Sequence, residues 1–137
     1  MIIDATDLIL GRLAAVAAKK ALLGESVIVV NCEKAVISGV RRQIVQAYLT
    51  KTHRKTVAHG PYFPRMPDRL VRRTIRGMLP YKKEKGEKAF KRVMCYIGVP
   101  KEFQGKSESL KSASIYERQI TKYVTLADIC KELGALL

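Results

Sequence analysis

Residues 1–30 read MIIDATDLILGRLAAVAAKKALLGESVIVV and place a helical pattern between two short apolar runs. Residues 1–4 form one strand candidate, and the β-branched run 27–30 is typical of a strand that is covered on both faces. Between them, apolar residues recur at helical spacing, namely Leu10, Leu13, Ala14, Ala17 and Ala21. Gly24 marks the end of that helix. A strand, a helix and a buried strand in this order predict a βαβ unit of a parallel sheet.

The C-terminal third extends this α/β pattern. Residues 93–97 predict another strand, and Thr125 with Asp128 predicts a capped helix over 126–133 that Gly134 ends. Residues 106–114 contain four serines and little apolar surface, which predicts a loop that is mobile or ordered by a partner. We expect one α/β domain over residues 1–137, with a basic insertion in its middle.

Composition excludes several classes of protein. Apolar residues make up 47% of the chain, which argues against a disordered protein. The apolar runs are far shorter than the ~20 residues of a membrane span, and no secretory signal is visible, so we expect a cytoplasmic protein. The three cysteines, Cys32, Cys95 and Cys130, form no C-x-x-C pair, which favours structural thiols without a metal or cofactor.

The charge is concentrated in one internal segment. The formal net charge is +14, and residues 41–92 carry sixteen Lys or Arg against three acidic residues, a net of +13. The flanks 1–40 and 93–137 are nearly neutral, at 0 and +1. A strongly basic chain indicates a polyanionic partner, either nucleic acid or an acidic membrane surface.

Residues 68–79 are the clearest element of this basic segment. On a helical wheel one face carries four arginines, Arg69, Arg72, Arg73 and Arg76, and the other carries Leu70, Val71, Ile75 and Met78. Asp68 is placed to cap this helix and Pro80 to end it. The guanidinium fork binds phosphate in a bidentate manner, so this face predicts phosphate contacts. The alternative is a merely solvated face.

The neighbouring segments repeat this arrangement. Residues 38–49 and 87–93 combine apolar stripes with cations, and three lysines surround a predicted turn at Gly86. Residues 51–67 contain three prolines, which predicts an extended loop. Tyr62 and Phe63 lie beside cations in that loop and could stack on unpaired RNA bases, or could simply pin the loop to the core.

We therefore expect an RNA-facing surface within residues 41–92. Its candidate residues are Arg41, Arg42, Lys51, His53, Arg54, Lys55, His59, Tyr62, Phe63, Arg65, Arg69, Arg72, Arg73, Arg76, Lys82, Lys83, Lys85, Lys88, Lys91 and Arg92. A small RNA-processing enzyme that uses His53 or His59 is the alternative from another class, and a DNA-packaging protein is a third. The common nucleotide-binding and zinc-protease motifs are absent from the sequence.

Several strings, taken in order, carry a resemblance to a known family. They are Leu10-Gly11-Arg12-Leu13-Ala14, Val29-Val30-Asn31-Cys32-Glu33, Ile37-Ser38-Gly39, Gly60-Pro61-Tyr62-Phe63, Arg76-Gly77-Met78-Leu79-Pro80, Lys85-Gly86 and Tyr96-Ile97-Gly98-Val99-Pro100. With them the chain resembles the L-thirteen family of large-subunit ribosomal proteins, in its archaeal and eukaryotic form.

This resemblance implies a three-layer α/β/α fold with a four-stranded parallel sheet. It also implies a structural constituent of the large ribosomal subunit, without catalysis, that binds large-subunit rRNA and supports assembly beside neighbouring ribosomal proteins. The chain lacks the His-Pro-His stretch of bacterial members and the long C-terminal helical extension of eukaryotic ones, which favours an archaeal source. We expect a monomer off the ribosome, because no long heptad pattern is present.

Overall fold

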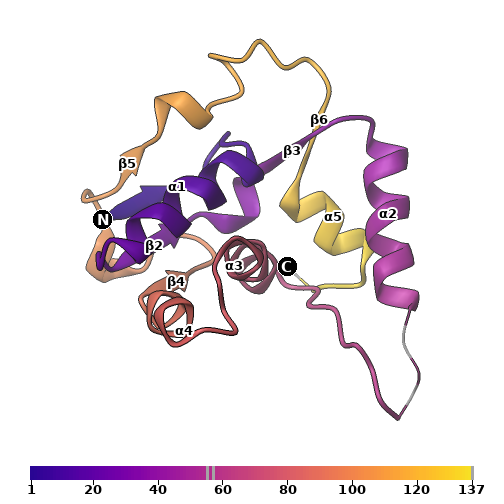
Figure 1. The fold of residues 1–137 in the computed structure, drawn as a ribbon. Helices are drawn as coiled ribbons and strands as arrows, with labels where there is room; N and C mark the ends of the chain where they lie inside the picture. The colour runs from indigo at the N-terminus through magenta and orange to yellow at the C-terminus, as the bar shows by residue number, and fades with distance from the viewer. Residues whose placement is uncertain (55, 57, 137) are drawn as a thin grey trace.

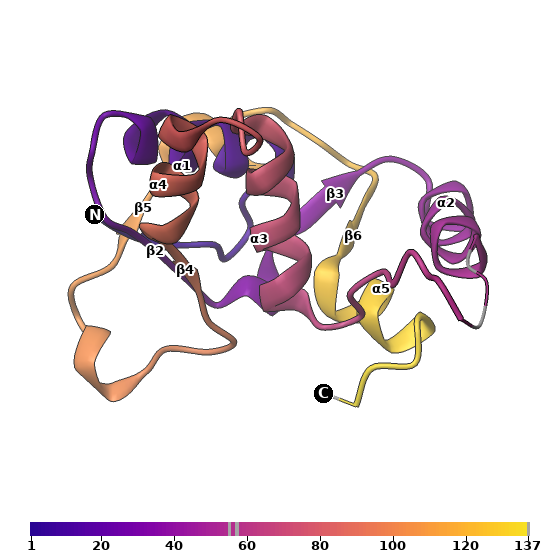
Figure 2. The same cartoon turned by 60° about the horizontal axis from the view of Figure 1, so that its bottom comes forward.

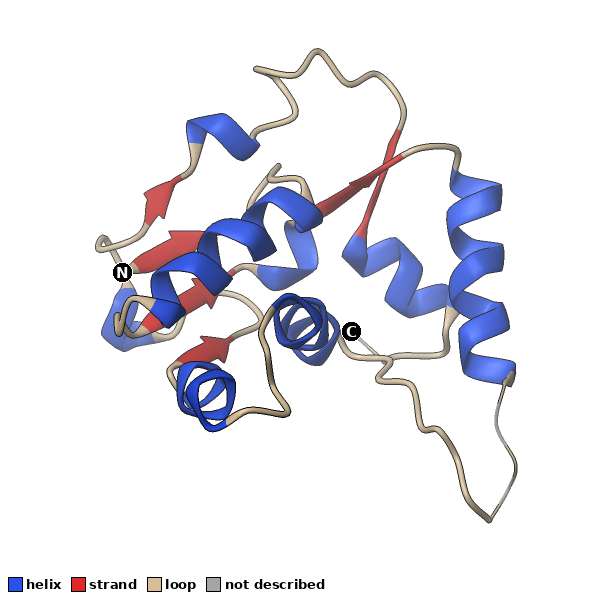
Figure 3. Cartoon of the chain, viewed as in Figure 1, coloured by secondary structure: helices blue, strands red, loops and turns tan. Residues whose placement is uncertain are grey.

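The computed structural model describes residues 1–54, 56 and 58–136. Four strands form a parallel sheet in the order β4-β2-β1-β5, namely β1 (Ile2–Asp4), β2 (Val27–Val30), β4 (Val93–Cys95) and β5 (Glu108–Ser109) (Figures 1 and 3). Ile2 pairs with Ile28 in the register of β1 and β2, and Val29 pairs with Cys95 in that of β2 and β4. The predicted βαβ unit is therefore confirmed.

Five α-helices accompany these strands in the described part of the chain: α1 (Leu10–Leu22), α2 (Arg41–His53), α3 (Pro67–Met78), α4 (Glu84–Lys91) and α5 (Leu126–Glu132). Helix α1 packs against both α3 and α4, and Figure 2 shows these three helices together on one side of the sheet. The architecture is α/β and is consistent with the expected three-layer α/β/α arrangement.

Apolar burial explains how the sheet and α1 hold together. The side chains of Leu13, Ala14 and Ala17 on α1 are completely buried, as are those of Ile3 on β1 and Val29 on β2. Small alanines allow α1 to approach the sheet closely, and burial of the larger apolar side chains supplies most of the stabilisation. The neutral N-terminal flank thus supplies a large part of the core, to which α3 and α5 add further buried side chains.

A second, two-stranded sheet was not predicted from the sequence. Strands β3 (Val36–Ser38) and β6 (Tyr123–Thr125) pair antiparallel, and they lead into α2 and α5, respectively. Helix α5 begins as predicted, because the N–H of Asp128 donates to Thr125 Oγ1 at 3.2 Å. Gly134 follows this helix with a φ of 83°, the left-handed conformation expected at a glycine stop.

Two predicted segments differ from the structure. Residues 106–114, predicted as a loop, include strand β5, which pairs with β1 and completes the four-stranded sheet. The helix expected over residues 38–49 instead spans Arg41–His53. Beyond Leu49, Thr50 and Thr52 donate their hydroxyls to the carbonyls four residues earlier, an arrangement that occurs inside helices.

A predicted turn and a predicted buried residue are also wrong. Gly86 was expected in a turn, but it is buried inside α4, which begins at Glu84. A Cβ at this position would collide with the carbonyl of Pro80, so the glycine allows α4 to pack against the preceding turn. Met78 was expected on the apolar face of α3, but its side chain is 43% exposed, and the buried residue at this end is Leu79.

Candidate nucleic-acid interface

Helix α3 separates its apolar and cationic residues as the sequence predicts. Leu70, Val71 and Ile75 are buried against the core. Pro67 occupies the first turn, where its missing N–H costs nothing. We call the four cations of the other side the α3 arginines: Arg69, Arg72, Arg73 and Arg76. All except Arg72, which is half-buried, are exposed.

Three of the α3 arginines stack on aromatic rings from neighbouring segments. The guanidinium carbon of Arg72 lies 4.6 Å from the ring centre of Phe90, that of Arg73 lies 4.7 Å from Phe63, and that of Arg76 lies 4.8 Å from Tyr81. Such stacking holds a guanidinium in place through its face and leaves the N–H groups at its edge able to bind an oxyanion. The arrangement therefore orders these side chains before any partner binds.

Arg72 differs from the other α3 arginines. Its partner Phe90 belongs to α4, so this contact ties two helices together. Its Nε atom is buried and has no hydrogen-bond acceptor within the described residues. We therefore assign Arg72 a packing role in addition to its charge, whereas Arg69, Arg73 and Arg76 present theirs to solvent.

The loop between α2 and α3 is attached to the protein through Phe63. The ring of Phe63 meets that of Tyr48 on α2 edge to face, with 5.9 Å between centroids. Lys51 Nζ lies 4.7 Å from the centre of the Tyr48 ring, and Arg73 Nη1 donates to the carbonyl of Tyr62 at 3.3 Å. Phe63 thus pins the loop, as one of the two interpretations from sequence proposed, while Tyr62 is 67% exposed.

Three hollows adjoin Phe63 in the described part of the chain, and two of them are larger than the third. One, of about 430 Å³, is lined by Thr52, Tyr62, Phe63, Pro64, Arg65, Met66 and Arg69. The other, of about 350 Å³, is lined by Lys51, Arg54, Pro61, Phe63 and Arg73. Helix α3 contributes an arginine to each, and these two arginines lie one helical turn apart. Aromatic and cationic side chains from α2, the loop and α3 are therefore brought together.

The cations of α4 have acidic partners within the chain. Lys88 forms an ion pair with Glu84 at 2.6 Å, and Lys91 forms one with Glu87 at 2.9 Å. The hydrogen bond and charge of Lys91 lower the pKa of the Glu87 carboxyl. Exposed pairs of this kind contribute little to stability. They do reduce the net positive charge of α4 relative to α3.

Two further predicted cations also contact groups of the chain itself. Arg92 Nη1 donates to the carbonyl of Ala21, in the last turn of α1, at 3.4 Å. Arg41 pairs with Glu132 at 2.9 Å and so joins α2 to α5. The lysines of the α3–α4 connection and the first turn of α4, namely Lys82, Lys83 and Lys85, are exposed.

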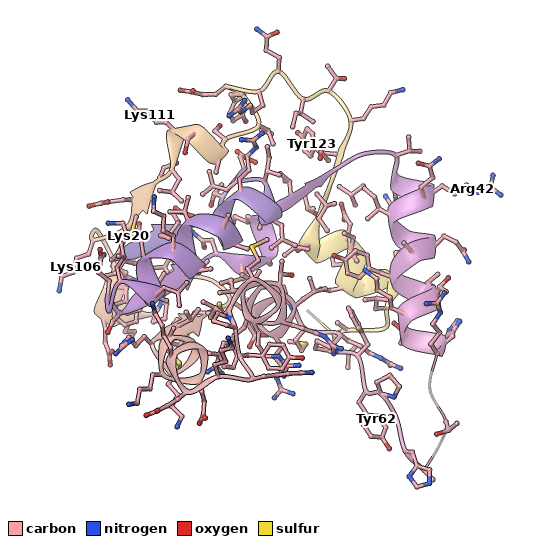
Figure 4. The ribbon with its side chains drawn as sticks, viewed as in Figure 1. Lys20, Arg42, Tyr62, Lys106, Lys111 and Tyr123 are labelled. Carbon is pink, nitrogen blue, oxygen red and sulfur yellow. The ribbon has the colours of Figure 1, made fainter. Side chains whose placement is uncertain are left out.

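The remaining predicted residues lie along α2 and its loop. Arg42 points away from the body of the protein, near the end of α2 opposite to the loop that carries Tyr62 (Figure 4). A helix of this length spans roughly 20 Å, so Arg42 is not part of the same cluster. His53, Arg54 and His59 are exposed. Lys55 lies outside the described residues.

The cysteines do not form a metal site in the described part of the chain, where no group of three or more ligating side chains occurs. The structure brings the thiols of Cys32 and Cys95 together, and this contact, with burial, raises the pKa of Cys32. Burial, and to a smaller degree the negative charge of Asp68, raises the pKa of Cys130 to about 11. The thiols of Cys32 and Cys130 therefore stay protonated at neutral pH.

Sequence reasoning missed the role of two aromatic residues. Tyr81 was not singled out, although it directly follows Pro80 and precedes two lysines, which is the signal that could have identified it. Phe90 was assigned to an apolar stripe, and nothing in the sequence indicates its contact with Arg72, since the two lie on different helices.

Comparison with known proteins adds the family context. A family model described as "Ribosomal protein L13" matches residues 1–102. A protein of Methanocaldococcus jannaschii is 46% identical over 98% of this chain and 97% of its own length. A protein of Archaeoglobus fulgidus is 45% identical over 97% of this chain and 86% of its own length. Both are named large ribosomal subunit protein uL13.

Proposed function

The chain belongs to the ribosomal protein L13 family, and we propose from this membership that it binds large-subunit rRNA and supports assembly of the large ribosomal subunit. The observation that carries the proposal is the set of α3 arginines, three of which are held on aromatic rings at 4.6–4.8 Å. Guanidinium groups fixed in this way are suited to phosphate oxygens.

The charge distribution supports RNA as the partner. Helices α2, α3 and α4 all lie within residues 41–92, which carry a net charge of +13. The sheet and α1, which come from the neutral flanks, pack against α3 and α4, and α5 of the C-terminal flank packs against α2. Phosphate contacts from a rigid cationic surface supply a large share of the affinity of proteins for RNA, and they explain why so much like charge is kept on one segment.

Family membership favours a structural role over the RNA-processing alternative. Catalysis by His53 or His59 would need a partner group that orients or activates the imidazole. Both histidines are exposed, and neither imidazole forms a hydrogen bond or an ion pair within the described residues. We therefore assign phosphate contact, not proton transfer, to these two positions.

Sedimentation of a cell extract tests the proposed assignment. We expect the protein to travel with the large subunit through a sucrose gradient, and to stay with it when the two subunits are separated at low magnesium concentration. We also expect the purified protein to be a monomer. Recovery of the protein mainly as a free homo-oligomer, with none in the large-subunit peak, would contradict the proposal.

A further inference from the structure

The hollow of about 430 Å³ beside Phe63 combines an aromatic ring with two cations. Tyr62, with 67% of its side chain exposed, forms one wall. Arg65 and Arg69, both exposed, approach from the loop and from α3. Thr52 also lines the hollow; it is buried, and its hydroxyl donates to the carbonyl of Tyr48 at 2.9 Å. The hollow is thus apolar and aromatic inside and cationic at the edge.

The structure fixes this hollow on both sides. Phe63, which follows Tyr62 in the chain, packs edge to face on Tyr48 of α2 and under Arg73 of α3. These two contacts hold the loop in place directly beside Tyr62. Arg65 lies beside the end of α5, since a Cβ at Gly134 would be 3.4 Å from Arg65 Nη1. A hollow held in this way needs little reordering to accept a ligand.

The chemistry of the hollow matches a nucleotide that has left its helix. An RNA base offers a flat apolar face that stacks on tyrosine, and its phosphate binds guanidinium groups. A volume of about 430 Å³ lies within the range of sites for small ligands, roughly 300–1,000 Å³. A base inside a duplex is stacked on both faces by its neighbours and cannot enter, so the hollow selects an unpaired nucleotide.

We infer that this hollow binds one unpaired nucleotide of the RNA, with its base on the ring of Tyr62 and its phosphate on Arg65 and Arg69. The inference rests on the proposed RNA-binding function and adds to it a site that recognises a base. The α3 arginines by themselves contact only the backbone and carry no preference for an unpaired base.

Two RNA probes of equal charge separate base binding from phosphate binding. One is a single-stranded hexamer of adenylate, and the other is a hexamer of the same ribose-phosphate backbone without bases. Fluorescence anisotropy of labelled hexamers with the full chain, at one low salt concentration, measures both affinities. We expect the adenylate hexamer to bind tighter by on the order of tenfold, because stacking of a base on an aromatic ring contributes at that level.

Variants of the full chain assign this preference to the hollow. Tyr62→Leu should reduce the preference for the adenylate hexamer to less than about twofold, whereas Tyr62→Phe, which keeps a ring, should retain it. Arg69→Gln should weaken binding of both hexamers by a similar factor and leave their ratio unchanged. Tyr116→Leu is the matched control, because Tyr116 is 73% exposed and belongs to the neutral C-terminal flank; it should leave the ratio unchanged.

Failure of the nucleotide site can be distinguished from failure of the proposed RNA-binding function. Equal affinity of the wild-type chain for the two hexamers, or no binding of either, would overturn the inference. A preference that survives Tyr62→Leu would overturn it as well. Either result leaves the proposed function standing if the chain still binds purified large-subunit rRNA, and loss of binding to that RNA would overturn both.

Discussion

Gly86 and Gly77 both lie inside helices, but only one of them has room for a side chain. A Cβ at Gly86 would collide with the carbonyl of Pro80, whereas a Cβ at Gly77 would meet no atom within 4 Å. Alanine is favoured over glycine in a helix by about 1 kcal/mol. Replacement of either glycine by alanine should therefore gain the same helix propensity, and the two replacements differ only in the packing of the added methyl group.

We predict opposite effects of alanine at these two positions. Gly86→Ala should lower the free energy of unfolding by about 1–3 kcal/mol, because α4 must move away from the preceding turn. Gly77→Ala should raise it by about 0.5–1 kcal/mol. Urea denaturation of both variants tests this. Equal stabilisation by the two alanines would mean that Gly86 is not needed for the contact with Pro80.

Asp4 at the end of β1 gives the stability a dependence on pH. Burial by itself would raise the pKa of Asp4, but hydrogen bonds from the side chain of Asn31, and from the N–H and hydroxyl of Thr6, together lower it below its ordinary value of 3.8. A lowered pKa in the folded state means that the ionised form stabilises the fold. This stabilisation is present above the unfolded pKa and is lost as the pH falls through the folded one.

We predict that Asp4→Asn lowers the free energy of unfolding by about 1 kcal/mol at pH 7, because the acceptor loses its charge. The difference from the wild-type chain should shrink as the pH falls below 3.8. Denaturation curves at several pH values between 7 and 2 measure it. A difference that stays constant over this range would show that the charge of Asp4 plays no part.

At the scale of elements, the connection between α3 and α4 orders part of the cationic surface. Arg76 stacks on Tyr81 at 4.8 Å, and immobilising a long side chain on binding costs about 0.5–1.5 kcal/mol when it is not already ordered. The aromatic partner should therefore increase the affinity for RNA without carrying any charge itself.

We predict that Tyr81→Leu weakens binding of large-subunit rRNA by roughly two- to tenfold, corresponding to that entropy cost. The dependence of the affinity on salt should not change, because the number of cations is the same. Filter binding at several salt concentrations separates the two quantities. An unchanged affinity would show that the stack does not prepare Arg76 for binding.

Elements with a strong apolar period could be predicted from the sequence, and those without one could not. Helix α3 was predicted because Leu70, Val71 and Ile75 recur at helical spacing ahead of Pro80. Strand β5 was missed because Glu108 and Ser109 are both exposed and polar. Its place in the sheet comes from backbone pairing with β1, to which side-chain patterns give no clue.

The candidate site shows the same division. The cations could be predicted because charge is visible in the sequence, and the helical period of α3 placed four arginines on one side. Their aromatic partners could not be predicted, since Phe63 and Phe90 reach Arg73 and Arg72 only through the packing of separate segments. The ion pairs of α4 were also missed, but their spacing of four residues could have indicated them.

At the scale of the whole molecule, the positive charge is concentrated in one internal segment, and the two flanks form the sheet that supports it. Residues 41–92 hold thirteen of the fourteen net positive charges, and the strands on either side of that segment join in the sheet that supports it (Figure 1). The structure also shows no helix long and apolar enough to span a membrane among the residues it describes. We propose that the surface built around the α3 arginines, and not the net charge alone, binds large-subunit rRNA.

The salt dependence of RNA affinity in two charge-matched variants tests that claim most directly. One variant replaces Arg69, Arg73 and Arg76 with Gln and keeps Arg72, which packs on Phe90. The control replaces Lys101, Lys111 and Lys122, three exposed residues of the C-terminal flank, with Gln. Both variants lose three charges, and circular dichroism would establish that each is folded.

We predict that the arginine variant binds large-subunit rRNA more weakly, with a plot of log affinity against log salt that is shallower by roughly two to three units. The lysine control should change this slope by less than about one unit. Equal changes of slope in the two folded variants would show that net charge, not the surface built around α3, binds the RNA.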